Sequence, residues 1–182
     1  MTDLPSVWLL DVDGVVNAAR PGWGGPPRRD TVSSASDSCH YPMRWAPPLV
    51  DRIRTLHRSG LVEVRWCSTW CPDADALERL WLLPPLERAF VDPVKGMAAS
   101  MAKLAAARRV LAGVRRLVWT DDAEVPEPGD PRYDELSADG RALLVRPSPR
   151  RGLQPADLDA IEAFARVGVR AVPGTTEPTG TH

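Results

Sequence analysis

The sequence contains few cysteines and no long hydrophobic stretch, and each scarcity argues against a class of protein. Its three cysteines are an odd and small set, which is typical of a reducing cytoplasm and provides no disulfide framework. No apolar run approaches the ~20 residues that a membrane-spanning helix needs, and the first residues lack the pattern of a signal peptide. We therefore expect a cytoplasmic protein that does not enter a membrane.

The chain also lacks an excess of charge of either sign. Its 23 basic and 24 acidic residues give a formal net charge of −1, which argues against a strongly basic nucleic-acid surface but leaves a local patch open. Apart from seven tryptophans, aromatic side chains for base stacking are scarce. The length of 182 residues predicts one domain, over residues 1–170, followed by a disordered Thr/Pro/Gly-rich tail over 171–182.

Short apolar runs alternate with helical patterns along most of the chain. The alternation predicts an α/β fold, with a parallel sheet of about five strands and helices on both faces. Two segments rich in glycine, proline or acids are predicted to be irregular, namely 18–47 and 124–134. Strands are predicted at 7–10, 61–67, 89–91, 117–120 and 142–145, and helices at 47–59, 73–83, 97–111 and 155–167.

Two acids follow the first apolar run. Residues 7–10 have the pattern of a short buried strand, and Asp11, Asp13 and Gly14 come directly after it. A strand buried on both faces cannot solvate a carboxylate, so the acids must lie at its carboxyl end, where ligands of open α/β sheets bind. Gly14 permits a sharp turn and a close approach of backbone N–H groups to an anion.

Two other predicted strands also end in polar side chains. Ser68 and Thr69 follow the second strand, and Asp121 and Asp122 follow the fourth. Right-handed crossovers bring the carboxyl ends of parallel strands to one edge, so these groups should converge with the first two acids. Carboxylates 4 Å apart repel by ~4 kcal/mol at an effective dielectric constant near 20, so either some of them stay protonated or a cation lies among them. Oxygen ligands without histidine or cysteine favour Mg²⁺.

The pattern Asp11-Val12-Asp13-Gly14-Val15 resembles the first motif of the haloacid dehalogenase (HAD) superfamily, DxDG(T/V). The resemblance implies an HAD-like Rossmannoid fold, a three-layer α/β/α sandwich around the parallel sheet. It implies that Asp11 is the nucleophile that takes up a phosphoryl group. It also implies that Asp13 protonates the leaving group and then activates water. Val15 stands where threonine is commoner, which removes no catalytic group.

Three further motifs of the superfamily have counterparts in the same order. The hydroxyl that holds phosphoryl oxygens is Ser68, with Thr69 in reserve. The lysine that neutralises the nucleophile and the phosphate is Lys103, one of only two lysines in the chain. The acidic pair of the fourth motif is adjacent here rather than spaced, and which acid binds the metal directly stays open. The implied metal ligands are Asp11, Asp13, Asp121 and Asp122, and the implied substrate-binding residues are Ser68, Thr69 and Lys103.

The implied function is a Mg²⁺-dependent phosphatase that works through an aspartyl-phosphate. The 18 residues from Lys103 to Asp121 are similar to the spacing in a small, nearly cap-less HAD branch that includes the HAD domains of RNA-repair proteins. Residues 18–47 lie where the superfamily inserts a flap or a cap, and they are too few for a large cap. We therefore expect an open site with a flap loop as its minimal cap. The substrate is a phosphorylated small molecule or a nucleic-acid end, so a polynucleotide end phosphatase is the alternative function.

The predicted flap carries several side chains that could touch a substrate. The simpler interpretation is that most are solvated loop residues and that a tryptophan packs on the body of the domain. The candidates are Trp23, Arg28, Arg29, His40, Arg44 and Trp45.

A non-catalytic phospho-accepting module, similar to a response-regulator receiver, would use the same kinds of residues. In such modules the acidic pair lies on the first strand and the lysine comes last. Here the DxD pattern comes first and Lys103 precedes Asp121. The order therefore favours the enzyme, and the sequence does not indicate an oligomeric state.

Overall fold

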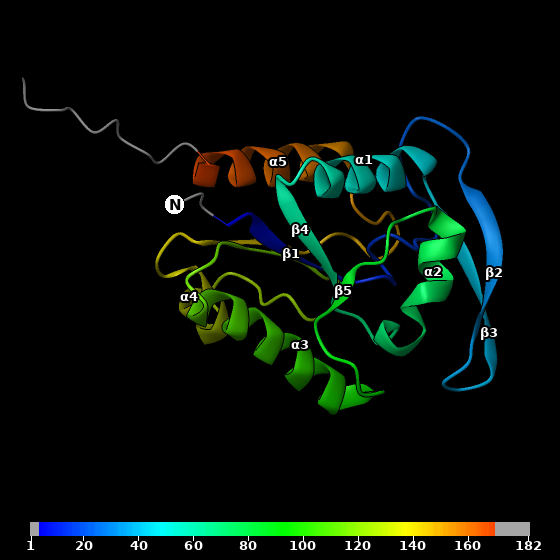
Figure 1. Ribbon diagram of the computed structural model, residues 1–182, viewed down its shortest axis with the longest axis horizontal. Helices are drawn as coiled ribbons and strands as arrows, with labels where there is room; N and C mark the ends of the chain where they lie inside the picture. Colours follow the sequence, from blue (N-terminus) through cyan, green and yellow to red (C-terminus); the bar gives the residue numbers. More distant parts are fainter. Residues whose placement is uncertain (1–3, 170–182) are drawn as a thin grey trace, which may run out of the picture.

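A computed structural model describes residues 4–169. Five parallel strands form a central sheet in the order β5-β4-β1-β6-β7, and helices cover both of its faces (Figure 1). The strands of this sheet are β1 (Ser6–Leu10), β4 (Val62–Trp66), β5 (Glu87–Arg88), β6 (Leu117–Thr120) and β7 (Ala142–Val145). The helices are α1 (Pro47–Arg58), the short 3₁₀ helix η1 (Cys71–Asp73), α2 (Ala74–Trp81), α3 (Gly96–Ala112), α4 (Pro131–Ser137) and α5 (Pro155–Val169).

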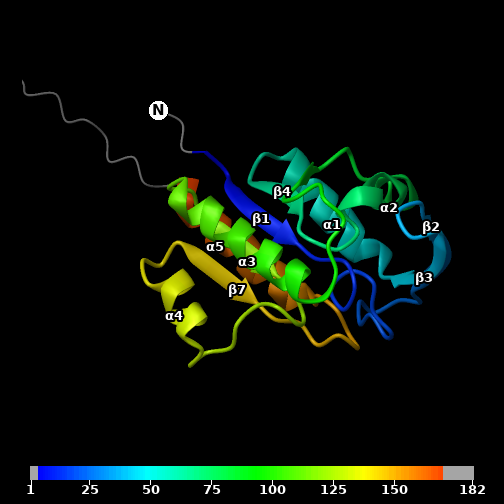
Figure 2. The same cartoon turned by 90° about the horizontal axis from the view of Figure 1, so that it is seen from below.

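The central strand β1 is buried on both faces. Trp8 and Leu10 pack into the core beneath α1 and α5, while Val7 and Leu9 pack into a second core beneath α3 and α4. Figures 1 and 2 show α1 and α5 over one face of the sheet and α3 over the other. This arrangement explains the continuous apolar run in β1, since a strand between two helical layers has no polar face. The predicted α/β architecture with a five-stranded parallel sheet is confirmed.

The topology brings the ends of β1 and β6 together. The chain runs from β1 outward through β4 to β5, then crosses to β6 on the other side of β1. Leu10 pairs with Trp66 of β4 and with Thr120 of β6, so residues 11, 67 and 121 leave the sheet at one level. The strand order reverses between β1 and β6, and open α/β sheets bind ligands at such a switch point.

Most predicted elements are confirmed, and the exceptions are short. The third strand was predicted two residues too late, because β5 spans only Glu87–Arg88 and is too brief to have a periodic pattern. The segment 124–134 was predicted as a loop, but α4 begins at Pro131 within it. Asp130 caps this helix by accepting a hydrogen bond from the Arg132 backbone N–H. Proline is well tolerated at a first helical position, so it starts the helix here rather than breaking it.

The largest correction concerns residues 18–47. The segment predicted as an irregular flap loop contains an antiparallel hairpin of two seven-residue strands, β2 (Arg28–Ser34) and β3 (Cys39–Trp45). Figures 1 and 2 show the hairpin at one end of the molecule beside α2. Val32, Met43 and Trp45 are buried, while most other hairpin side chains are exposed. The hydrophobic alternation is therefore too weak to predict strands next to so many glycines and prolines.

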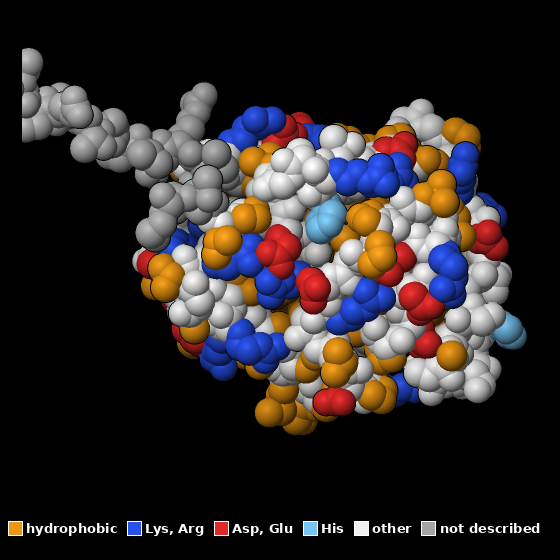
Figure 3. All heavy atoms as spheres, viewed as in Figure 1, with side chains coloured by type: hydrophobic (Ala, Val, Ile, Leu, Met, Phe, Trp, Pro, Cys, Tyr) orange, Lys and Arg blue, Asp and Glu red, His pale blue; other side chains and the backbone are white. Residues whose placement is uncertain are grey.

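Two further expectations concern the surface and the end of the chain. Across residues 4–169, no helix is both long and apolar enough to cross a membrane. The predicted tail, 171–182, lies outside the described residues. On the face drawn in Figure 3, acidic and basic side chains are interspersed, in line with the net charge of −1.

Candidate functional site

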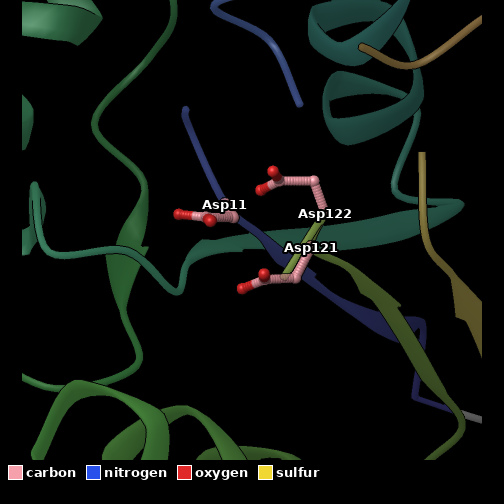
Figure 4. A group of neighbouring side chains, drawn as sticks. All are labelled: Asp11, Asp121 and Asp122. Carbon is pink, nitrogen blue, oxygen red and sulfur yellow. The ribbon is translucent and has the colours of Figure 1, made fainter. Parts of the chain in front are cut away.

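Three acids converge where β1 and β6 end. Asp11, Asp121 and Asp122 each offer a carboxylate oxygen, and these oxygens lie within 4.8 Å of one another. Figure 4 shows the three carboxylates turned toward a common space. Asp11 is 6% exposed, Asp121 is fully buried and Asp122 is half-buried. We call these three acids, together with Lys103 as their counterion, the acidic cluster.

Lys103 of α3 joins two of the acids. Its Nζ donates hydrogen bonds to Oδ2 of Asp11 at 2.9 Å and to Oδ2 of Asp121 at 2.7 Å. Only 8% of the Lys103 side chain is exposed, so both contacts are shielded from water. A buried charge is tolerated only where it is paired and hydrogen-bonded. The lysine therefore holds the two strand ends in a fixed relation to each other.

The acidic cluster has more negative than positive charge. Burial and the charge of Asp121 raise the pKa of Asp11 to about 7, although Lys103 and a hydrogen bond from Ser68 act to lower it. Burial and Asp121 also raise the pKa of Asp122. Burial acts to lower the pKa of Lys103, but the charges of Asp11 and Asp121 outweigh it and the pKa is raised. These directions are those expected of three carboxylates that share one ammonium group.

Asp121 is anchored by the turn that follows β6. Its Oδ1 accepts hydrogen bonds from the backbone N–H groups of Ala123, at 3.0 Å, and Glu124, at 2.8 Å. Its Oδ2 accepts from Lys103, so each of its oxygens is held by a donor. The carboxylate therefore has one defined orientation within the acidic cluster.

Gly14 makes room for Asp122. A Cβ atom built on Gly14 would lie 2.3 Å from Cγ of Asp122, far inside van der Waals contact. The glycine also has φ +72°, which residues with a Cβ adopt only at a cost. A glycine is therefore required at position 14 for two reasons, the positive φ of the turn and the close packing of Asp122.

Asp13 lies apart from the acidic cluster. It is exposed, and the structure groups the other three acids without it. Its Oδ1 accepts a hydrogen bond from Nδ2 of Asn17 at 2.7 Å, and its Oδ2 accepts one from Nε1 of Trp70 at 2.9 Å. It also lines two cavities, of about 610 and 290 Å³. The Asp13 carboxylate therefore lies outside the group of three that could share one metal ion.

The two hydroxyl residues after β4 occupy different positions. Ser68 is 1% exposed, and its hydrogen bond lowers the pKa of Asp11, so it lies at the acidic cluster. Thr69 is exposed and lines the cavity of about 290 Å³ beside Asp13. The structure therefore brings Ser68 to Asp11 and Thr69 to the cavity beside Asp13.

Two residues that hold Asp13 were not predicted as part of the site. Asn17 also accepts a hydrogen bond from the Arg44 backbone N–H at 2.8 Å, so it links the turn to β3. Trp70 packs edge-on against Tyr41 of the hairpin, with 5.2 Å between ring centroids. Both roles depend on how the hairpin docks, which no spacing rule predicts. The only sequence signal is that Asn17 lies four residues after Asp13.

Some of the candidate residues in the predicted flap pack against the rest of the domain, and others line a cavity. Trp23 donates from Nε1 to a backbone carbonyl before α5 at 2.7 Å, and Trp45 is buried in the core. His40 hydrogen-bonds a serine hydroxyl of β2 at 2.8 Å. Arg29 and Arg44, by contrast, line the cavity of about 610 Å³ that reaches Asp13. These two arginines are the flap candidates that the structure brings toward the site.

Comparison with known proteins assigns the chain to no family. No protein-family model, no curated protein and no solved structure matches it. The arrangement of the acidic cluster, Asp13 and the hairpin is therefore the basis on which a function is proposed.

Proposed function

We propose that the protein is a Mg²⁺-dependent phosphatase of the HAD-like type, which hydrolyses phosphomonoesters through an aspartyl-phosphate on Asp11. One observation carries the proposal: Lys103 lies between Asp11 and Asp121 in a buried site at the carboxyl edge of a parallel sheet. The three residues come from distant parts of the chain, and their convergence is what the four-motif pattern requires. A buried lysine in contact with a nucleophile suits chemistry on an anionic substrate.

The donor set of the acidic cluster suits Mg²⁺. Three carboxylates offer only hard oxygen ligands, the type that this ion prefers. When all are ionised, three carboxylates and one ammonium leave two negative charges, which a divalent cation would balance. Asp11, Asp121 and Asp122 would hold the ion. When bound, it would neutralise the repulsion between the nucleophile and an incoming phosphate dianion.

Asp11 and Asp13 divide the covalent chemistry. A carboxylate oxygen of Asp11 attacks phosphorus, the P–O bond to the alcohol breaks, and Asp13 gives its proton to the departing oxygen. Asp13 then takes a proton from water, whose oxygen attacks phosphorus. This second step releases inorganic phosphate and restores the Asp11 carboxylate. The exposed position of Asp13, with Asn17 and Trp70 orienting its two oxygens, suits this exchange.

Lys103 and Ser68 stabilise the phosphoryl group as its charge moves. The ammonium lies against Asp11, where the phosphoryl oxygens arrive, and the Ser68 hydroxyl is at the same carboxylate. Fixed donors of this kind favour the transition state because they do not have to reorganise during the reaction. Thr69 lines the cavity beside Asp13, where the remainder of the substrate would pass.

The test is turnover of 4-nitrophenyl phosphate with Mg²⁺. We expect Asp11→Asn, which keeps the shape of the side chain, to lower kcat/KM by at least about a thousandfold. The matched control is Asp75→Asn, because Asp75 is an exposed acid of α2 that pairs with Arg79. This control should keep wild-type activity. Equal rates for the wild type and Asp11→Asn would refute the proposal.

Acetyl phosphate separates the enzyme from a phospho-accepting module. An enzyme of the proposed type turns the reagent over and releases phosphate continuously. A receiver-like module would take up about one phosphoryl group per chain and release it slowly. Stoichiometric labelling of Asp11 without turnover would therefore favour the alternative.

A further inference from the structure

Two arginines face each other across the hairpin near Asp13. Arg29 of β2 and Arg44 of β3 are direct partners in the antiparallel register. Both line the cavity of about 610 Å³ to which Asp13 and Gly14 also contribute. This cavity therefore extends from the turn that carries the proposed acid and base to a pair of guanidinium groups.

Neither arginine forms an ion pair with a carboxylate. Within residues 4–169, eleven arginines form such pairs and nine do not, and of those nine only Arg29 and Arg44 line the cavity that reaches Asp13. Like charges directly opposite each other in a sheet are destabilising. Asp30 borders the same cavity, but its Oδ1 accepts a hydrogen bond from the Thr31 backbone N–H at 2.7 Å, and the Arg44 guanidinium donates to the neutral Ala19 carbonyl. Two opposed cations without carboxylate partners in a concave site suggest an anionic ligand.

The hairpin holds Arg44 in a fixed place relative to Asp13. The backbone N–H of Arg44 donates to Oδ1 of Asn17 at 2.8 Å, and its carbonyl accepts from the Ala18 N–H at 3.0 Å. Asn17 in turn donates to Asp13. An anion on the arginines would thus lie at a set distance from a phosphate at Asp11. A site with such a spacing can select substrates by the separation of two anionic groups.

We propose that Arg29 and Arg44 bind a second phosphate of the substrate, so that the preferred substrate carries a phosphomonoester near a further phosphate group. This inference rests on the proposed phosphatase function. Guanidinium groups suit the role because they form charge-assisted, often bidentate hydrogen bonds to phosphate oxygens. The shared chemistry fits a small bisphosphorylated metabolite and also a phosphorylated nucleic-acid end, where the second group is a phosphodiester.

Arg28 provides a matched control within the same hairpin. It precedes Arg29 in β2 and is exposed, but it does not line the cavity. Successive residues of a strand point to opposite faces, so Arg28→Gln removes one positive charge from the other side. A purely long-range effect of charge would appear in this variant as well.

The experiment compares the preference for a second phosphate in four proteins. It measures kcat/KM for 4-nitrophenyl phosphate, a nucleoside 3′,5′-bisphosphate and a 3′- or 5′-phosphorylated oligonucleotide, with the wild type, Arg28→Gln, Arg29→Gln and Arg44→Gln. We expect the wild type to prefer one or both of the substrates with a second phosphate. We expect this preference to fall by about tenfold in Arg29→Gln and Arg44→Gln and to persist in Arg28→Gln. If the nucleoside bisphosphate shows the preference, the substrate is a small metabolite. If the phosphorylated oligonucleotide shows it, the substrate is a nucleic-acid end.

Two outcomes would overturn the inference. One is a wild type that treats one-phosphate and two-phosphate substrates alike, and the other is an unchanged preference in Arg29→Gln. If the wild type hydrolyses nothing, the proposed function fails, and the subsite is then tested by calorimetric binding of the nucleoside bisphosphate to Asp11→Asn. Weaker binding upon adding Arg29→Gln would support the subsite, and equal binding would exclude it.

Discussion

The acidic cluster and the β2–β3 hairpin meet at the turn that carries Asp13, but different forces hold them. The acidic cluster is largely buried and charged, so removal of Lys103 would leave desolvated carboxylates without their counterion. The hairpin is mostly exposed and is held by a few buried apolar side chains and by hydrogen bonds near its ends. Asp73 accepts hydrogen bonds from Ser34 and Ser36 near its tip, and Asn17 accepts one from the backbone of β3. The comparison teaches that the proposed reaction site and the proposed recognition site have separate structural supports.

Removal of the buried lysine should have the largest effect on stability. Lys103→Met leaves Asp11 and Asp121 without their counterion, so we expect the free energy of unfolding to fall by about 3–5 kcal/mol in metal-free buffer. The only other lysine, Lys95, is the matched control. Its side chain is 81% exposed and lies 3.7 Å from Asp37, so Lys95→Met should change stability by less than about 0.5 kcal/mol. Urea denaturation measures the unfolding free energy of both variants. Similar losses in Lys103→Met and Lys95→Met would show that the buried ion pairs of Lys103 contribute no more than an exposed one.

The pH dependence of stability should come from the acidic cluster and not from the hairpin. Burial raises the pKa of Asp11 from 3.8 to about 7, so the folded metal-free protein keeps a proton that the unfolded chain loses near pH 4. The stability from Asp11 is therefore fully present below about pH 4 and is lost as the pH rises to about 7. The difference of about three between the folded and unfolded pKa values of Asp11 corresponds to at most about 4 kcal/mol of unfolding free energy.

Asp11→Asn isolates this contribution. In EDTA, from pH 4 to pH 8, the wild type should lose stability relative to the variant. Added Mg²⁺ should make the stability difference between the two proteins less dependent on pH, because the ion favours the ionised carboxylate. If the unfolding free energies of the two proteins change in parallel with pH, Asp11 has an ordinary pKa and charge repulsion does not destabilise the acidic cluster.

The sequence was sufficient to predict the acidic cluster because its parts follow simple local rules. β1 and β6 are short apolar runs, and an acid follows each directly. Parallel strands in the right-handed α/β arrangement end at one edge, and the register of Leu10 with Thr120 carries Asp11 and Asp121 to the same level. Lys103 was predicted from the resemblance to the HAD motif order, and the rarity of lysine in this chain supported the choice. The signals for the acids, by contrast, are contained within a few residues and one topological rule.

The hairpin and its contacts could not be predicted in this way. Its exposed strands have no clear alternation, and proline occupies one position of β3. The contacts of Trp70 with Tyr41 and of Asn17 with the backbone of β3 depend on how the hairpin packs beside α2 and the turn after β1. Such contacts depend on tertiary packing between segments whose sequences contain no matching pattern. The positions of the buried candidate site residues were thus more predictable than the surface around them.

A comparison of two glycines sharpens the role of the turn. Gly14 and Gly60 both have φ +72°, but a Cβ on Gly14 would lie 2.3 Å from Asp122, whereas one on Gly60 meets no atom within 4 Å. Alanine at either position should destabilise by about 1 kcal/mol through the backbone alone. Only Gly14→Ala should displace Asp122, and we expect it to weaken Mg²⁺ binding by about tenfold or more. Calorimetric titration with Mg²⁺ tests this, and equal affinities in the two variants would remove Asp122 from the metal site.

Trp70 connects the two regions, and its substitution should affect stability about as little as either glycine substitution. Trp70→Phe removes the Nε1 hydrogen bond to Asp13 but keeps an aromatic ring against Tyr41. We expect a loss of about 1 kcal/mol in stability and a fall in kcat of about tenfold, because the Asp13 carboxylate loses a donor that orients it. Tyr41→Phe is the control, since its hydroxyl bonds Asp37 and not Asp13.

The decisive readout for Trp70 is kcat relative to the Tyr41→Phe control. If both variants lose kcat by the same factor, the tryptophan merely supports the packing of the hairpin. If Trp70→Phe alone lowers kcat while the preference for a second phosphate stays at the wild-type ratio, the proposed proton transfer at Asp13 and the proposed recognition at Arg29 and Arg44 are independent. We expect this independence because, within residues 4–169, the Asp13 carboxylate hydrogen-bonds Asn17 and Trp70 and neither arginine side chain.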